Sequence, residues 1–295
     1  MQKLLIKGKK ELSGKISISG SKNSTLPILA ASILADQVVL KNVPLVKDIF
    51  TMVELLNFIG LKTKILKNKN IVKIENIKKS INTLAPYKLL KTMRAGVLVL
   101  GSLLTKYGMA KVSLPGGCAI GTRPVDVHLF GLKKLGAKIK IKNGYIFAEA
   151  AHGLTGAEIE FPSISVGATE NVIIAASLAK GITYLKNCAC EPEIKNLTNF
   201  LEKMGINITW TNKREIKIVG KKNLKPVTHT IMFDRIEAGT FIIAGALTRK
   251  NLKIKGLDTK VIKNELNILK KMGVKFKITN KEIQVLTSKN IKPIA

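Results

Sequence analysis

The feature that most constrains the fold is a motif that occurs four times at intervals of roughly 70 residues, long for a solenoid repeat. A hydrophobic residue and a glycine end a helical stretch, and an alternating strand follows. The four copies are IGLKTKI with Gly60, LGAKIKI with Gly136, MGINITW with Gly205 and MGVKFKI with Gly273. A period of this length fits a compact supersecondary unit. The sequence therefore predicts four copies of one such unit.

Each copy has the same order of elements. An apolar, alanine-rich helix is expected at 25–35, 95–104, 171–179 and 239–247. Strands are expected to follow at 37–43, 109–114, 182–188 and 252–257. A second helix with apolar residues at i, i+3 and i+4 comes next, and a strand hairpin closes the copy. We therefore predict an α/β fold built from βαβαββ-like units, with the alanine-rich helices inside a ring of small sheets.

A polar segment precedes the first helix of each copy. The four segments are SGSKN (19–23), KTMR (91–94), SVGAT (165–169) and DRIEAG (234–239). Helix N-termini present free N–H groups and a partial positive charge, which favour anions. Plain N-capping by Ser24, Thr25 or Thr169 is the simpler interpretation. Capping alone does not explain why Lys22, Asn23 and Arg94 occupy matching positions, so an anion site formed by several segments stays open.

A glycine-rich loop presents a single thiol. The stretch SLPGGCAIGTRPVDVH (113–128) places Cys118 after a Pro-Gly-Gly sequence that neither a helix nor a strand accommodates well. Arg123, Asp126 and His128 follow within ten residues. A thiol on such a loop beside ionisable groups indicates a reactive site on a lid, although a small, inert loop residue is the alternative.

The net charge of +31 raises the question of nucleic-acid binding. Only five of the 50 basic residues are arginine, the lysines are spread along the whole chain, and aromatic residues make up 5%. Base stacking and arginine recognition of guanine are therefore not supported. We expect no specific nucleic-acid partner, only salt-sensitive polyanion binding and a preference for anionic substrates.

Metal and membrane chemistry are not indicated. The three cysteines include a CxC pair at Cys188 and Cys190, which is poor zinc spacing, and the three histidines form no ligand motif. We expect free thiols, no metal and no cofactor. No apolar run approaches the ~20 residues of a membrane span. With no signal-peptide core at the N-terminus, a cytoplasmic location without membrane insertion is expected.

Six segments together resemble the enolpyruvyl transferases that act on UDP-N-acetylglucosamine. They are SGSKNSTLPILAASILA, APYKLLKTMRAG, VSLPGGCAIGTRPVDVHLFGLKKLGA, SVGAT, CEPEI and DRIEAGTF. The resemblance covers essentially the whole chain. PGGC followed by IGxRPVDxH is the most specific part, because the related shikimate-pathway enzymes share the fold without this loop. The fold that the resemblance implies is the inside-out α/β barrel.

The resemblance also implies a reaction and its residues. The 3′-hydroxyl of UDP-N-acetylglucosamine attacks C2 of phosphoenolpyruvate and phosphate leaves, which commits the sugar to peptidoglycan, and hence to cell-wall biogenesis, cell shape and division. Cys118 would be the catalytic thiol that protonates C3. Contacts to phosphoenolpyruvate are implied for Lys22, Asn23, Arg94 and Arg123. The UDP-sugar contacts implied are Arg94, Arg123, Pro124, Val125, Asp126, Val127, Ser163, Ile164, Ser165 and Val166.

The chain departs from the family pattern in length. The family has six units, three in each domain. Here we expect a three-unit domain at 22–232, which holds the Cys118 loop and the UDP-sugar site. A partial second domain at 1–21 plus 233–295 would hold one unit of three. No residue can be assigned as the family's general-base Asp or its further phosphate-binding Arg.

We therefore treat the chain as truncated at its C-terminus and keep three hypotheses. It is a transferase subunit that a second polypeptide completes, or a non-catalytic remnant that still binds UDP-sugar. A basic nucleic-acid-binding protein is the least favoured.

Overall fold

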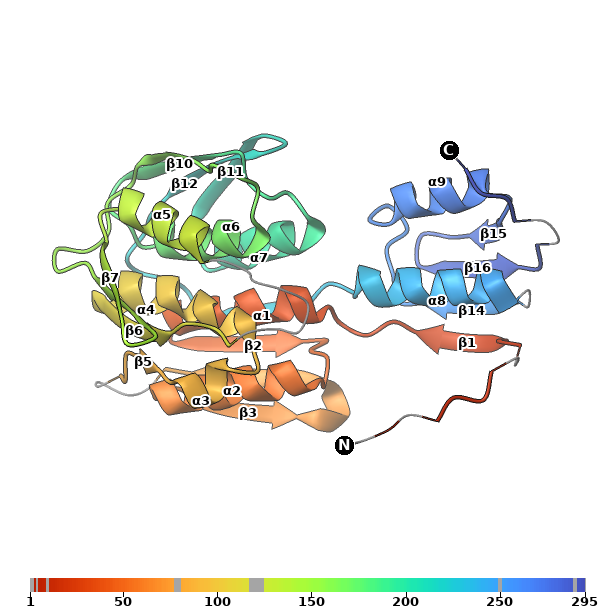
Figure 1. The fold of residues 1–295 in the computed structure, drawn as a ribbon, viewed down its shortest axis with the longest axis horizontal. Helices are drawn as coiled ribbons and strands as arrows, with labels where there is room; N and C mark the ends of the chain where they lie inside the picture. The colour runs from red at the N-terminus through yellow and green to blue at the C-terminus, as the bar shows by residue number, and fades with distance from the viewer. Residues whose placement is uncertain are drawn as a thin grey trace. The chain divides into compact units, whose positions relative to one another are not determined.

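The structure is a computed structural model that describes residues 3, 5–8, 11–76, 81–116, 125–248, 251–288 and 291–294. The chain divides into two compact units (Figure 1). The larger unit is Lys22–Met232, and the smaller unit combines Met1–Ser21 with Phe233–Ala295. Each unit has a hydrophobic core of its own.

Three four-stranded sheets with the same topology make up the strands of the larger unit. The first has the order β13 (Val227–Thr230), β2 (Gln37–Lys41), β4 (Ile71–Glu75), β3 (Lys62–Leu66). The second has the order β5 (Leu84–Ala85), β6 (Met109–Ser113), β8 (Tyr145–Glu149), β7 (Lys138–Lys142). The third has the order β9 (Glu158–Glu160), β10 (Ile182–Lys186), β12 (Glu215–Val219), β11 (Asn207–Asn212).

The first strand in each of these orders is parallel to its neighbour, and the other pairings are antiparallel. Because β13 follows the third repeat and pairs with β2 of the first, the chain returns to its starting sheet. The three repeats of the larger unit therefore form a closed arrangement.

The apolar helices of the three repeats pack against one another. They are α1 (Lys22–Ala31), α4 (Val99–Tyr107) and α6 (Val166–Ala176), and each contacts the other two. Most of their residues are buried, including nine of the eleven in α6. The second helices are α2 (Lys47–Ile59), α5 (Asp126–Lys134) and α7 (Pro192–Lys203). Short helical segments complete the unit: η1 (Ser32–Leu34), η2 (Lys67–Lys69), α3 (Tyr87–Leu90) and η3 (Arg94–Leu98). The predicted α/β class with enclosed alanine-rich helices is confirmed.

The repeated glycine has a conformational cause. Gly60, Gly136, Gly205 and Gly273 have φ values of 120°, 94°, 100° and 96°. Each lies at the end of a second helix, where a residue with positive φ stops the helix and releases the chain into the following strand. A side chain in this conformation would be strained, so the same residue type recurs in each copy.

The smaller unit contains one repeat. Its sheet has the order β1 (Gly14–Ser17), β14 (Leu252–Lys255), β16 (Glu282–Leu286), β15 (Lys275–Ile278), with β1 parallel to β14. The unit also contains α8 (Arg235–Thr248) and α9 (Lys263–Lys271). Ile236, Ile243 and Leu247 of α8 are 54%, 49% and 70% exposed. One face of α8 thus lacks the cover that α1, α4 and α6 give one another.

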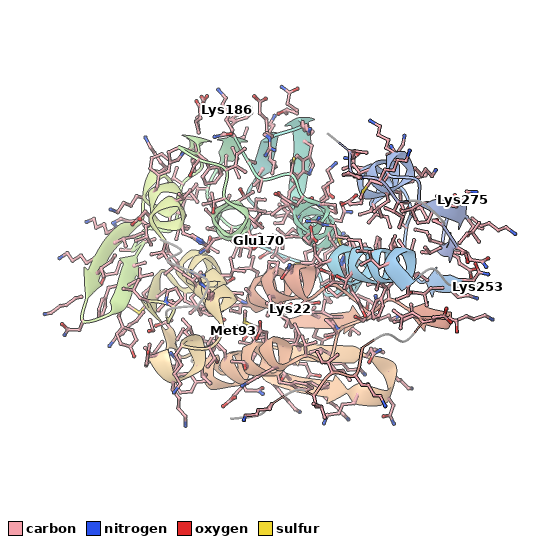
Figure 2. The ribbon with its side chains drawn as sticks, turned by 45° about the vertical axis from the view of Figure 1, so that its right-hand side comes forward. Lys22, Met93, Glu170, Lys186, Lys253 and Lys275 are labelled. Atoms are coloured by element: carbon pink, nitrogen blue, oxygen red, sulfur yellow. The ribbon has the colours of Figure 1, made fainter. Side chains whose placement is uncertain are left out.

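Lysines alternate with apolar residues along many strands, as in the KIKIK of β7 and the KFKI of β15. The side chains of Lys186, Lys253 and Lys275 extend outward from their strands (Figure 2). The basic residues therefore lie on strands of both units. Among the described residues, no helix has the length and apolar composition that crossing a membrane requires.

Some expected boundaries and caps were wrong. The helix expected at 171–179 begins at Val166, because the polar segment before the apolar run is already helical. Ser165 caps this helix, and Thr169 instead accepts a hydrogen bond from the N–H of Ala189. Similarly, Ser24 lies inside α1, where its hydroxyl donates to Asn196.

Candidate functional site

The predicted site residues that the structure describes lie on, or just before, helical elements of the larger unit. Cys118, Arg123 and Pro124 fall outside the described residues. Lys22 and Asn23 begin α1, and Arg94 begins η3. The UDP-sugar residues that are described fall at the start of α5 (Val125, Asp126, Val127) and of α6 (Ser163, Ile164, Ser165, Val166).

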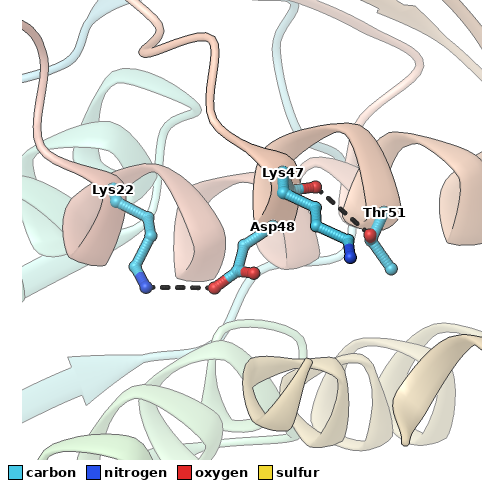
Figure 3. A network of polar contacts seen from close by, with 4 residues as sticks. All are labelled: Lys22, Lys47, Asp48 and Thr51. Atoms are coloured by element: carbon cyan, nitrogen blue, oxygen red, sulfur yellow. Dashed lines mark hydrogen bonds and ion pairs between the residues drawn. The ribbon is translucent and has the colours of Figure 1, made fainter. Parts of the chain in front are cut away.

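Lys22 forms an ion pair that sequence reasoning missed (Figure 3). Its Nζ donates to Oδ2 of Asp48 at 3.0 Å, and Asp48 lies in the first turn of α2 beside Lys47. Side-chain exposures of 43% and 32% mean that solvent screens the pair, so it contributes little to stability. It does hold the ammonium group at the N-terminus of α1. Asn23, the next residue, is exposed.

Arg94 lies on an element that links the other helices. The segment η3 contacts both α1 and α6, and α5 packs against α6. Arg94 itself is half-buried. Figure 2 labels Lys22, Met93 (the residue before Arg94) and Glu170 on these elements. The fold thus packs the elements that carry three of the four predicted polar segments, α1, η3 and α6, against one another.

The first turn of α6 is open to solvent. Ser163, Ile164 and Val166 are exposed. Ser165 is the N-cap: its Oγ accepts from the N–H of Ala168 at 3.3 Å, and its carbonyl accepts from the N–H of Thr169 at 3.0 Å. This turn therefore presents the positive end of the helix dipole on an accessible surface.

A buried amide connects the elements behind this turn. Oδ1 of Asn171 accepts from the N–H of Gly101 at 2.8 Å, and its Nδ2 donates to the carbonyl of Val97 at 3.2 Å. The same Nδ2 lies 3.2 Å from Nδ1 of His128. Burial lowers the pKa of His128 to about 4, so its imidazole is neutral at neutral pH. Asn171 escaped sequence reasoning, although a polar pair inside the apolar stretch ATENVIIAA was a usable signal.

Three carboxyl groups influence one another around Glu170, the residue before Asn171. Glu170 is buried, and its burial, followed by the negative charges of Glu193 and Glu191, raises its pKa well above the ordinary value. Oε2 of Glu191 is also buried, with no hydrogen-bond partner in the described part of the chain. The pKa rises because ionising Glu170 would place a charge in a low-dielectric interior beside two others.

The fourth polar segment, 234–239, forms hydrogen bonds within the smaller unit. Oδ1 of Asp234 accepts from the N–H groups of Ile236 and Glu237 at 2.9 and 3.0 Å, which caps α8. Glu237 in turn accepts from the N–H of Ser19 at 2.9 Å and from its hydroxyl. These carboxylates therefore tie α8 to the strand region that begins the chain. Within the described residues, no three His, Cys, Asp or Glu side chains are grouped so that they could hold a metal ion.

Solved structures define the class of fold. The enolpyruvyl transferase NikO from Streptomyces tendae matches with a TM-score of 0.85 at 21% identity, over 95% of this chain and 66% of that one. EPSP synthase from Acinetobacter baumannii matches with a TM-score of 0.78 at 18% identity, over 97% of this chain and 67% of that one. The fold is that of the enolpyruvyl transferases.

Sequence comparisons define the family. Residues 6–295 match the EPSP synthase (3-phosphoshikimate 1-carboxyvinyltransferase) family. The UDP-N-acetylglucosamine 1-carboxyvinyltransferase of Pelagibacter ubique (strain HTCC1062) is 58% identical over 295 residues, and that of Endomicrobium trichonymphae is 47% identical over 294. These matches span 100% and 99% of this chain and 70% of each relative. The chain belongs to this family and groups with its UDP-N-acetylglucosamine 1-carboxyvinyltransferases.

Proposed function

We propose that this protein transfers the enolpyruvyl group of phosphoenolpyruvate to the 3′-hydroxyl of UDP-N-acetylglucosamine and releases phosphate. The observation that carries the proposal is the 58% identity to a UDP-N-acetylglucosamine 1-carboxyvinyltransferase over all 295 residues. The PGGC and RPVDVH segments lie within this match. The product would enter peptidoglycan synthesis as its first committed intermediate, in the cytoplasm, and so support cell-wall biogenesis, cell shape and division.

The reaction needs a proton donor for C3 of phosphoenolpyruvate. As the sugar hydroxyl loses its proton to a general base, for which these 295 residues offer no assigned group, and bonds to C2, the double bond gives its electron pair to C3, which takes a proton. We assign this proton to the thiol of Cys118, because the family resemblance gives it this role and because a cysteine that follows two glycines in the sequence, with an arginine five residues later, is typical of a reactive loop thiol. Phosphate then leaves C2 and C3 loses a proton, which restores the double bond.

Basic side chains supply the electrostatic part of the site. We assign Lys22 and Asn23 to phosphoenolpyruvate, and Arg94 and Arg123 to its phosphate or to the phosphates of the sugar nucleotide. The contact between Lys22 and Asp48 supports this assignment, because it holds the ammonium at the start of α1 while the Lys22 side chain stays 43% exposed. We assign 125–127 and 163–166 to the UDP-sugar.

Binding of the sugar nucleotide without turnover is the second candidate function. The observation that favours it is that no residue of these 295 can be assigned as the family's general-base Asp or its further phosphate-binding Arg, while the relatives extend beyond the part matched here. In that case these 295 residues would bind the nucleotide sugar without turning it over.

Phosphate release from phosphoenolpyruvate in the presence of UDP-N-acetylglucosamine tests the proposal. The assay is run on this chain alone and with a polypeptide that supplies the part of the relatives not matched here, with Cys118→Ala as the control. Release that the substitution abolishes supports the transferase, and its dependence on the added polypeptide would mean that turnover needs the part of the relatives not matched here. No release under either condition, with sugar-nucleotide binding intact, would leave only the binding function.

A further inference from the structure

The outer face of the second sheet combines lysines with aromatic rings. Side chains alternate along its strands, so that Val112 and Ile146 point into the core while their neighbours face outward. Strand pairing sets Phe147 of β8 opposite both Lys111 and Lys140. We call this surface the lysine–aromatic face and define it by six outward residues: Lys111, Lys138, Lys140, Lys142, Tyr145 and Phe147.

Lys111 contacts both rings of the lysine–aromatic face. Its Nζ lies 5.0 Å from the ring centroid of Tyr145 and 5.1 Å from that of Phe147, which is within the range of a cation–π contact. The hydroxyl of Tyr145 also accepts a hydrogen bond from the backbone N–H of Tyr87 at 3.4 Å, and Tyr87 is 53% exposed. Half-buried rings therefore lie in the middle of this face, with lysines on the strands to either side.

The other sheets lack this combination. The first sheet exposes lysines but has no aromatic residue on any of its strands. In the smaller unit, the aromatic residue of the sheet, Phe276, packs against the core. The third sheet has Tyr184 on its outer face, but that face also carries three glutamates: Glu158, Glu160 and Glu215. The lysine–aromatic face has four lysines beside one glutamate, Glu149.

We propose that the lysine–aromatic face docks on the surface of an anionic lipid bilayer. Its lysines complement the negative charge of the lipid phosphates, and tyrosine and phenylalanine rings are suited to the boundary between headgroups and acyl chains. Such attachment at the surface needs no helix that spans the bilayer. The inference goes beyond the proposed function and does not depend on it.

The geometry favours a lipid surface over single-stranded nucleic acid. Three neighbouring strands present a broad face to a planar partner, whereas proteins that bind single strands without sequence preference combine a basic groove with ring faces on which bases stack. Here the ammonium group of Lys111 lies over both rings. The charged residues of this face are lysines and one glutamate, so it offers no arginine for recognition of a base.

Sedimentation with lipid vesicles tests the proposal. The 295-residue chain is mixed with vesicles of equal parts phosphatidylglycerol and phosphatidylcholine at near-physiological ionic strength, where the Debye length is about 8 Å. We expect binding to these vesicles and little binding to vesicles of phosphatidylcholine alone. Replacing Lys138, Lys140 and Lys142 together with glutamine should weaken binding by about 10- to 100-fold, because three charges next to the bilayer are lost.

The first sheet supplies the matched control. Lys62, Lys64 and Lys73 are exposed on its outer face, and replacing these three with glutamine removes the same charge from the same unit. We expect this control variant to bind the anionic vesicles within about 3-fold of the unsubstituted chain, because charges on a face that does not meet the bilayer are screened by salt.

Acetylation of lysines with acetic anhydride, followed by mass spectrometry, gives a second readout that needs no substitution. In the presence of the anionic vesicles, Lys138, Lys140 and Lys142 should react more slowly than in their absence. Lys62, Lys64 and Lys73 should react at an unchanged rate. This measurement decides the proposal even where a triple variant fails to fold.

Three outcomes would overturn the proposal. If the chain does not bind the anionic vesicles, the face has no affinity for such a bilayer. Equal weakening in both triple variants, or equal protection of both groups of lysines, would mean that the net charge of the chain attracts the vesicles. Protection of the lysine–aromatic face by a single-stranded oligonucleotide but not by vesicles would assign the face to nucleic acid. None of these results depends on binding or turnover of the nucleotide sugar, so the proposed function is tested separately.

Discussion

Replacing His229 with leucine should change how the stability of the larger unit depends on pH. His229 lies on β13, is 3% exposed, and packs edge-on against Phe200 with ring centroids 5.5 Å apart. Neither ring nitrogen has a hydrogen-bond partner among the residues that the structure describes. Burial, with a smaller contribution from the positive charge of Lys203, lowers its pKa from 6.5 to about 4.

The sign and size of the effect follow from proton linkage. The unfolded chain protonates this histidine near pH 6.5 whereas the folded unit does so only near pH 4, so stability is lost as the pH falls through this window. Between pH 7.5 and pH 5 the loss from His229 is at most about 2 kcal/mol, because relaxation on protonation can only reduce it. The leucine variant should lack this loss.

At pH 7.5 the two proteins should differ less. Leucine removes two buried nitrogens without partners, which stabilises by about 1–3 kcal/mol, but it also loses the ring contact with Phe200, which costs about 0.5–1.5 kcal/mol. The prediction therefore concerns how the difference in the free energy of unfolding between the two proteins changes with pH. That change does not depend on how these two contributions balance.

Urea denaturation followed by the fluorescence of Trp210 is a suitable assay. Trp210 is the only tryptophan of the chain and lies on β11, so its signal reports the larger unit. The free energy of unfolding is compared at pH 7.5 and pH 5 for the unsubstituted chain, His229→Leu and the exposed control His152→Leu. A variant that loses as much stability as the unsubstituted chain over this range would refute the assignment of His229 as a buried neutral base.

Three further outcomes follow from the same structure. Glu170→Gln should raise the melting temperature more at pH 8 than at pH 5. In the unsubstituted chain the pKa of Glu170 is raised by folding, so the stability of the folded unit falls as the pH rises above 4.5, whereas glutamine has no proton to lose. Gly101→Ala should destabilise by about 3 kcal/mol in calorimetry, because its Cβ would overlap Asn171, whereas Gly239→Ala, with open space at its Cβ, should not destabilise. Leu247→Gln, on the exposed face of α8, should leave stability within about 0.5 kcal/mol and reduce binding of a hydrophobic dye, and unchanged dye binding would argue against that face being accessible.

Local sequence patterns were enough to predict the elements of the fold. The apolar runs, the alternating strands and the repeated glycines depend on residues close together in the chain, so the order helix, strand, helix, hairpin could be predicted for every copy. The predicted helices began too late because polar residues such as those before Asn171 were assigned to loops. In the structure these polar residues belong to the first turns of α6, and the buried Asn171 is satisfied by a hydrogen bond from the N–H of Gly101 on a neighbouring helix.

The candidate site could be predicted only in part. Lys22 and Arg94 stood out as basic residues before apolar helices, and the role of Cys118 came from the family resemblance. The partner of Lys22, in contrast, is Asp48 of another helix, and the partners of Asn171 are backbone groups of η3 and α4 and a ring on α5. No local pattern encodes such contacts, since they form only when distant segments pack.

The amino-acid sequence by itself determined the repeat, the types of its elements, the glycine that ends each second helix and the family to which the chain belongs. Only the tertiary structure decided that β13 returns to β2, that the buried amide of Asn171 contacts groups on η3, α4 and α5, and that burial raises the pKa of Glu170. The physical reason is the range of the interactions. Backbone conformation and hydrophobic periodicity act over a few residues, whereas strand pairing, burial and the pKa shifts that burial causes depend on groups that are far apart in the chain.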